Sequence, residues 1–139
     1  MQTVALGLST IQHIGIPVTN LARSEAFYQG LGFSNVMQST FDHAVGKGNV
    51  AMMQSGSIIL EIYQMPALAL AEIAARKNGH IDHIALDVTD VETVFQTLRQ
   101  AGYTILEETP VFLPFWEKGC KYFNILGPDG ERLEFNQRL

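Results

Sequence analysis

An internal repeat constrains the fold of this chain more than any other feature. The segment "IQHIGIPVTN", from residue 11, matches "IDHIALDVTD", from residue 81, at an offset of 70 residues. The endings "LEIYQ", from residue 60, and "LEFNQ", from residue 133, match at an offset of 73. The additional residues fall in a turn, where "NILGPDG" replaces "QSGS", and surface loops tolerate such changes of length. We interpret the chain as two copies of one structural unit.

Each unit is predicted to contain one helix and four strands. The opening run of each copy alternates and is rich in β-branched residues, which indicates a strand. Asn20 and Asp90 are natural N-caps, and apolar residues follow them at helical spacing. Gly32 and Gly102 stand where a helix would end, and further β-like runs follow each of them. The predicted fold class is therefore α+β, with two tandem βαβββ modules and eight strands.

The 139 residues are enough for about one domain with a real core. We place module one at about residues 10–65 and module two at about residues 80–139. Pro66 is predicted to open a short, Ala-rich linker helix over about residues 66–79, because proline is favoured at the first helical position.

Composition excludes several classes of function. The net charge of −5 argues against a nucleic-acid surface, which would carry a basic patch. No stretch approaches the roughly 20 apolar residues that a membrane span needs. The single cysteine, Cys120, excludes an intrachain disulfide and fits a reducing cytoplasm. We expect a cytoplasmic protein that binds a small molecule, with no nucleic-acid or membrane partner.

The repeat also duplicates a histidine and a glutamate. His13 and His83 fall on the first strand of each unit, and Glu61 and Glu134 fall on the last. If these two strands pair, histidine and glutamate project from one face of the sheet. Two units facing each other would then bring two imidazoles and two carboxylates together. That set suits a divalent ion such as Zn²⁺, Ni²⁺, Co²⁺, Fe²⁺ or Mn²⁺.

A structural explanation of the same residues remains open. A lone histidine on an apolar strand is more often a hydrogen-bonded structural residue than a ligand. A glutamate within "IILEIY" can point to solvent, since strand faces alternate. The metal hypothesis is preferred because all four residues occupy equivalent places in the repeat.

Four motifs resemble the vicinal oxygen chelate superfamily. This group includes glyoxalase I, methylmalonyl-CoA epimerase, extradiol dioxygenases, fosfomycin-resistance thiol transferases and bleomycin-resistance proteins. The motifs are "HIGIPVTNLARSEAFYQGLGF", "LEIYQ", "HIDHIALDVTD" and "GPDGERLEF", and the resemblance runs from about Thr10 to the C-terminus. It implies a glyoxalase-like cleft of eight strands. It also implies that His13, Glu61, His83 and Glu134 bind one divalent metal ion.

Within this superfamily, the His, Glu, His, Glu set looks most like glyoxalase I. The implied function is a metal-dependent lyase or isomerase that acts on a small hydroxy-carbonyl or thiol-adduct substrate by enediolate formation. A metal-free, ligand-sequestering protein of the bleomycin-resistance type and an epimerase like methylmalonyl-CoA epimerase are the alternatives. The resemblance also implies a homodimer, and whether one chain or two complete each site stays open.

Two positions depart from the glyoxalase I pattern. Pro17 stands where an arginine commonly helps to hold glutathione, and Gln64 stands where an asparagine is expected. Glutathione is therefore left open as a cosubstrate.

The proton shuttle and the substrate pocket complete the set of candidate residues. A carboxylate beside the substrate carbon is the natural base. Glu134 is the preferred shuttle and Glu61 the other candidate.

The segment "PVFLPFWEKG" is rich in aromatic residues. Its Phe112, Phe115 and Trp116 either line the substrate pocket, cap the core or contact a second chain.

Overall fold

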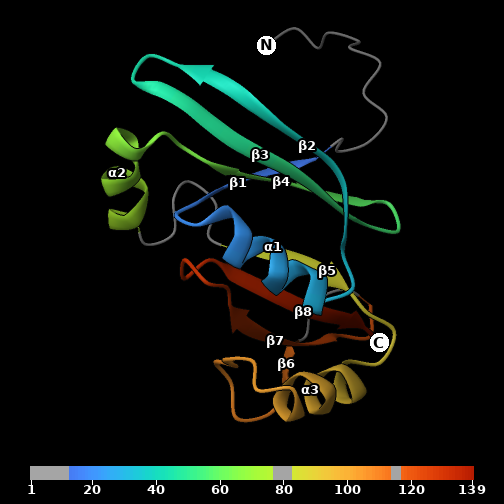
Figure 1. The fold of residues 1–139 in the computed structure, drawn as a ribbon. Helices are drawn as coiled ribbons and strands as arrows, with labels where there is room; N and C mark the ends of the chain where they lie inside the picture. The colour runs from blue at the N-terminus through green and yellow to red at the C-terminus, as the bar shows by residue number, and fades with distance from the viewer. Residues whose placement is uncertain (1–12, 77–82, 114–116) are drawn as a thin grey trace, which may run out of the picture. The chain divides into compact units, whose positions relative to one another are not determined.

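The computed structural model describes residues 13–76, 83–113 and 117–139. The chain divides into two compact units, Met1–Ile73 and Ala74–Leu139. Each unit contains a four-stranded sheet with a helix packed on one face (Figure 1). The prediction of an α+β fold built from two tandem βαβββ modules is confirmed.

Unit one follows the predicted order of elements. These are β1 (Ile14–Val18), α1 (Leu21–Gly30), β2 (Ser34–His43), β3 (Gly46–Ser55) and β4 (Ile58–Gln64). The strands lie in the order β1-β4-β3-β2, so the first strand of the unit is hydrogen-bonded to the last. β1 and β4 are parallel, and the other pairs are antiparallel.

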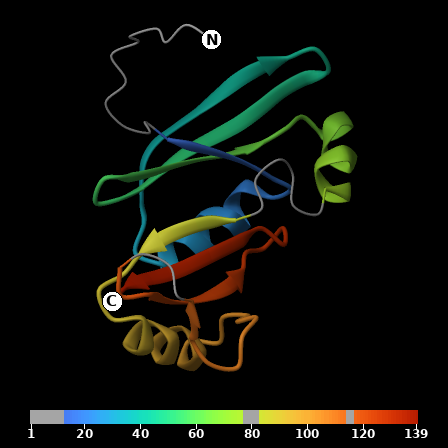
Figure 2. The ribbon, with the colours of Figure 1, turned by 180° about the vertical axis from the view of Figure 1, so that it is seen from behind.

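Unit two has the same topology. Its elements are β5 (Ile84–Asp87), α3 (Val91–Gln100), β6 (Val111–Leu113), β7 (Cys120–Leu126) and β8 (Arg132–Arg138). The strand order is β5-β8-β7-β6, and β5 and β8 are parallel. In Figure 2 the arrows of β5 and β8 point in the same direction. In both units the strand that directly follows the histidine therefore lies beside the strand that carries the glutamate.

The segment between the modules contains a short helix. After Pro66 it forms a 3₁₀ turn, η1 (Ala67–Ala69), and then α2 (Leu70–Ala75). The helix ends at Ala75, before the predicted end near residue 79, and residues 77–82 lie outside the described part of the chain.

Both module helices begin and end in the same way. Asn20 and Asp90 each accept a hydrogen bond from the backbone N–H three residues on, at 2.9 and 3.0 Å. Gly32 and Gly102 follow the helices with φ values of 89° and 82°, a region that side chains disfavour. The predicted caps are confirmed at both ends of both helices.

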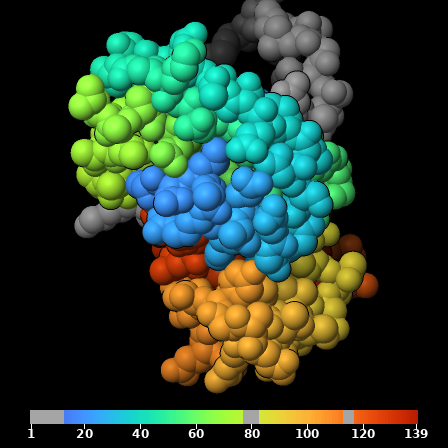
Figure 3. Space-filling model, in the orientation of Figure 1, coloured from blue at the N-terminus to red at the C-terminus, as the bar shows by residue number. Residues whose placement is uncertain are grey.

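Aromatic side chains form the centre of each core. In unit one, Tyr28 of α1 is fully buried and meets Phe33 edge-on. In unit two, Phe123 of β7 stacks on Phe135 and meets Phe95 of α3 edge-on, with ring centroids 5.2 Å apart in both pairs. α3 packs on β7 and β8, and Figure 3 shows its gold to orange atoms at the surface of unit two. One face of each sheet is thus buried under its helix.

Candidate functional site

His13 and Glu61 form a contacting pair in unit one. The parallel register places Gly15 of β1 opposite Glu61 of β4. His13 lies two residues before Gly15, so alternation gives both residues the same face of the sheet. The His13 Nε2 and Glu61 Oε2 atoms are 3.3 Å apart, and both side chains are about one-third exposed.

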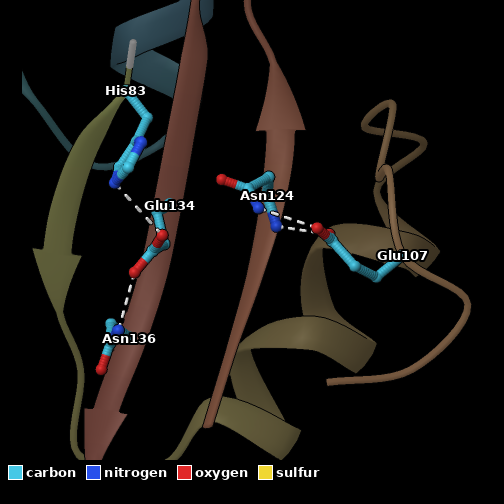
Figure 4. A network of polar contacts seen from close by, with 5 residues as sticks. All are labelled: His83, Glu107, Asn124, Glu134 and Asn136. Atoms are coloured by element: carbon cyan, nitrogen blue, oxygen red, sulfur yellow. Dashed lines mark hydrogen bonds and ion pairs between the residues drawn. The ribbon is translucent and has the colours of Figure 1, made fainter. Parts of the chain in front are cut away.

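His83 and Glu134 form the equivalent pair in unit two. Ala85 of β5 lies opposite Glu134 of β8 in the same parallel register. The distance from His83 Nε2 to Glu134 Oε2 is 3.4 Å, and the dashed line between the two side chains marks it in Figure 4. The glutamate is more buried here, because 14% of its side chain is exposed against 32% for Glu61.

The two pairs have the chemistry of a divalent-metal site. Neutral imidazole nitrogens and carboxylate oxygens are ligands that zinc and related ions accept. Each unit supplies one nitrogen ligand and one oxygen ligand. Among the residues that the structure describes, no group of three or more His, Cys, Asp or Glu side chains gathers within metal-binding reach. Each pair is thus half of the predicted ligand set.

Gln64 and Gln137 lie on the helix side of their sheets, a role that was not predicted from the sequence. The side-chain oxygen of Gln64 accepts the backbone N–H of Leu21 at 2.7 Å. The side-chain oxygen of Gln137 accepts that of Val91 at 2.9 Å. Each glutamine therefore caps the helix of its own unit. The signal was present in the sequence, since both "LEIYQ" and "LEFNQ" end in glutamine.

This placement also fixes the face of each glutamate. Gln64 and Gln137 come three residues after Glu61 and Glu134 on the same strands, so they point to the opposite face. Both glutamates therefore lie on the sheet face that the helix does not cover.

Glu134 has a further partner that sequence reasoning missed. The Asn136 side chain donates a hydrogen bond to Glu134 Oε1 at 2.7 Å (Figure 4). Because the two residues are two positions apart on β8, they share one face, and this spacing is visible in the sequence. The equivalent residue in unit one is Tyr63. Among the described residues, Glu61 has no amide partner of this kind.

A second polar contact lies on β7, beside this network. Asn124 is opposite Glu134 in the antiparallel register of β7 and β8. Glu107, from the segment after α3, accepts hydrogen bonds from both the backbone N–H and the side-chain amide of Asn124, at 2.6 and 2.7 Å. Asn124 is buried, with 6% of its surface exposed.

Of the three predicted pocket residues, the described part of the chain includes Phe112. Phe112 of β6 lies opposite Lys121 of β7, and Lys121 forms an ion pair with Glu92 of α3 at 2.8 Å. Phe112 therefore lies on the helix side of the sheet, with 53% of its surface exposed. Phe115 and Trp116 lie outside the described residues.

Two units of one βαβββ fold, each with a His–Glu pair on the open face of its sheet, define a protein of the vicinal oxygen chelate class. The family model described as "Glyoxalase/Bleomycin resistance protein/Dioxygenase superfamily" matches residues 10–135. The chain belongs to this superfamily, which confirms the resemblance.

The chain is also similar to individual proteins. The chain is 30% identical over 132 residues to the uncharacterized protein YwbC of Bacillus subtilis (strain 168), covering 92% of this chain and 97% of that protein. Its fold is similar to a glyoxylase/bleomycin resistance protein/dioxygenase domain from Frankia sp. EAN1pec, with a TM-score of 0.73, 15% identity and 95% and 99% of the two chains covered.

A third similarity is to the trypanothione-dependent glyoxalase I of Leishmania major. The TM-score is 0.66, with 22% identity and coverage of 92% of this chain and 86% of that one. At this identity the likeness concerns the fold alone. Within the described residues, no helix is long and apolar enough to cross a membrane.

Proposed function

We propose that this protein is a metal-dependent lyase or isomerase of the glyoxalase I type, acting on a small hydroxy-carbonyl or thiol-adduct substrate in the cytoplasm. The observation that carries the proposal is the repeated His–Glu pair, which has matching atoms in contact in both units. A structural role for one histidine is ordinary, but two such pairs, each on the sheet face opposite the helix of its unit, favour a shared ligand.

His13, Glu61, His83 and Glu134 are the proposed ligands of one Ni²⁺, Zn²⁺, Co²⁺, Mn²⁺ or Fe²⁺ ion. A divalent cation at such a site acts as a Lewis acid and stabilises negative charge on substrate oxygens. We expect a homodimer, as the resemblance to the superfamily implies.

Glu134 is the proposed proton shuttle, and Glu61 is the other candidate. Formation of an enediolate requires a base that takes the proton from the carbon next to the substrate carbonyl and returns it to the neighbouring carbon. The hydrogen bond from Asn136 orients the Glu134 carboxylate on β8. Such a fixed orientation favours proton transfer, which depends on geometry before acidity.

The proposal does not require glutathione. Gln64 is engaged as the cap of α1, so its amide points away from the Glu61 face. Pro17, at the position where an arginine is common in glyoxalase I, offers no side-chain donor for a carboxylate. A different thiol adduct or a simple hydroxy-carbonyl compound therefore fits the proposal equally well.

Metal analysis combined with a substrate screen tests the proposal. Protein purified with Ni²⁺, Co²⁺ and Zn²⁺ supplied should hold about one ion per chain, and His13→Ala and His83→Ala should each lose it. The matched control is His43→Ala, because His43 is exposed in the β2–β3 hairpin. Metal-loaded protein should then convert at least one hydroxy-carbonyl or thiol adduct.

Two outcomes would redirect the assignment. If wild-type protein binds no divalent ion in titration, the ligand-sequestering alternative replaces the enzyme. If the loaded protein exchanges the proton next to the carbonyl of an acyl-CoA but leaves hydroxy-carbonyl compounds unchanged, the epimerase alternative replaces the lyase.

A further inference from the structure

Asn124 carries an unusual buried oxygen. Its side chain is 6% exposed, and its Oδ1 atom has no hydrogen-bond donor among the residues that the structure describes. A buried carbonyl oxygen without a partner destabilises the fold, so native proteins keep such atoms rare. An atom of this kind next to a candidate site can serve as an acceptor if its orientation is fixed, and Glu107 fixes it.

Glu107 determines which end of the Asn124 amide faces the site. An ionised carboxylate only accepts hydrogen bonds, so the amide atom that meets Glu107 Oε1 at 2.7 Å is the nitrogen. The oxygen must then point the other way. A second bond, from the Asn124 backbone N–H to Glu107 Oε2 at 2.6 Å, fixes the carboxylate itself.

The Asn124 Oδ1 atom points toward Glu134 on the neighbouring strand (Figure 4). The N–H of Asn124 bonds to Glu107, and its C=O accepts the N–H of Leu106, so both backbone groups point away from β8. Asn124 and Glu134 therefore form a non-hydrogen-bonded antiparallel pair, in which side chains on the same face approach most closely. Figure 4 shows the Asn124 oxygen directed toward Glu134 and away from Glu107.

We infer that Asn124 Oδ1 is a substrate-binding acceptor, which selects ligands that carry an O–H or N–H donor beside the atoms held at the proposed metal site. The inference rests on the proposed function, because Glu134 is a ligand in that proposal. It adds a requirement on the substrate: besides its chelating oxygens, the substrate carries one donor. Unit one lacks this acceptor, since Met52 stands opposite Glu61.

Two small chelators that differ by one donor test the inference. Acetohydroxamate binds divalent ions through two neighbouring oxygens and keeps an N–H group, and N-methylacetohydroxamate replaces that group with a methyl. Isothermal titration of Ni²⁺-loaded wild-type protein should give tighter binding of acetohydroxamate, by about three- to tenfold relative to the N-methyl compound. Each measured affinity is divided by the affinity of the same chelator for free Ni²⁺ before the two are compared.

Glu107→Gln is the decisive variant, because it changes no volume. A glutamine amide can donate to Asn124 Oδ1 while its oxygen accepts the backbone N–H, so the Asn124 amide turns over and presents its nitrogen to the site. The preference for acetohydroxamate should disappear or reverse. Asn124→Ala should also abolish the preference. Glu25→Gln is the matched control, since Glu25 accepts a similar bond from Asn35 at 2.8 Å elsewhere in unit one.

The outcomes separate this inference from the proposed function. If wild-type protein binds no Ni²⁺, the proposed function fails and the inference fails with it. If Ni²⁺ binds but wild type shows no preference, the inference alone is wrong. It is also wrong if Glu107→Gln melts like wild type and keeps the full preference. A preference that is lost in Glu107→Gln and Asn124→Ala, and retained in Glu25→Gln, supports it.

Discussion

The two His–Glu pairs share one backbone frame but differ in their neighbours. In each unit the glutamate lies opposite a small residue of the parallel strand, Gly15 beside Glu61 and Ala85 beside Glu134. A methyl group at Gly15 would come 3.6 Å from Glu61 Oε2, an ordinary contact. The backbone arrangement around each His–Glu pair is therefore the same in both units, and each glutamate faces a small residue.

The side chains around each glutamate have diverged. Glu61 is flanked by Met52 and Tyr63, whereas Glu134 is flanked by Asn124 and Asn136. Unit two consequently offers a hydrogen-bond donor to its glutamate and a buried acceptor beside it, whereas unit one has a thioether and a phenol at the equivalent positions. In the proposed function the two units would supply equivalent ligand pairs, and unit two would also supply the polar contacts suited to proton transfer.

The largest expected effect comes from removing the basic carboxylate of Glu134 in unit two. Glu134→Gln should lower kcat by about 10²–10⁴-fold once a substrate is known, because general acid–base catalysis contributes that much. Metal content should change little, since the other three ligands remain. Glu61→Gln should be milder. Paired measurements of metal stoichiometry and kcat for both variants check the expectation.

Opposite results would reverse the comparison. A Glu134→Gln enzyme near the wild-type rate, together with a collapsed Glu61→Gln enzyme, would assign the shuttle to unit one. Full activity in both variants would leave the carboxylates with a structural role only.

Mixing variants tests whether the two pairs of one site come from one chain. Chains carrying His13→Ala are refolded together with chains carrying His83→Ala. If each site combines unit one of one chain with unit two of its partner, mixed dimers contain one intact site. The mixture should then regain roughly a quarter of wild-type activity from inactive parents. A site within one chain gives no recovery, and a monomer in sedimentation would exclude shared sites altogether.

The hydrogen bond from Asn136 should account for part of the metal affinity. Partners that orient metal ligands typically contribute about 10–100-fold in affinity. Asn136→Leu removes the donor to Glu134 with little change in size, so the Kd for Ni²⁺ should rise by about that factor. Tyr63→Phe is the matched change in unit one and should leave the Kd unchanged. Equal changes of the Kd in Asn136→Leu and Tyr63→Phe would mean that Asn136 contributes no more to metal affinity than Tyr63 does.

Much of the fold followed from the sequence because its signals are local. The repeat, the N-caps Asn20 and Asp90, and the glycines Gly32 and Gly102 each act within a few residues of their own position. The contact of each histidine with the glutamate of its unit required only the pairing of the first strand with the last.

The contacts of Asn124 could not be predicted, because they depend on register across the sheet. Asn124 meets Glu134 only through the alignment of β7 with β8, and Glu107 reaches Asn124 from 17 residues away in an irregular segment. The placement of Phe112 on the α3 side is also a result of register, since one residue of shift would exchange the faces. Residues that act through such pairings leave no pattern in the sequence.

The two capping glutamines should affect stability without affecting the site. Gln64→Met and Gln137→Met each remove an acceptor for a helix N–H and keep the side-chain length. Each should lower the free energy of unfolding by about 1 kcal/mol. The effects should add in the double variant, because the residues lie in different units. Urea unfolding measures both, and an altered Kd for Ni²⁺ would show that the two sheet faces are coupled.

The smallest expected difference concerns the N-caps, Asp90 in unit two and Asn20 in unit one. Hydrogen bonds from the backbone N–H and then the hydroxyl of Thr93 lower the pKa of Asp90 below its ordinary value of 3.8. Because the folded pKa lies below the unfolded one, the stabilisation is fully present above about pH 3.8 and is lost as the pH falls through the folded value. Asn20 does not titrate.

Wild-type protein should therefore lose more unfolding free energy between pH 6 and pH 3 than the Asp90→Asn variant, whose cap matches that of unit one. The contributions of all other carboxylates cancel in the difference between the two proteins. Urea unfolding of both proteins at several pH values measures this, and a gap between them that stays constant with pH would show that the Asp90 charge contributes nothing to the cap.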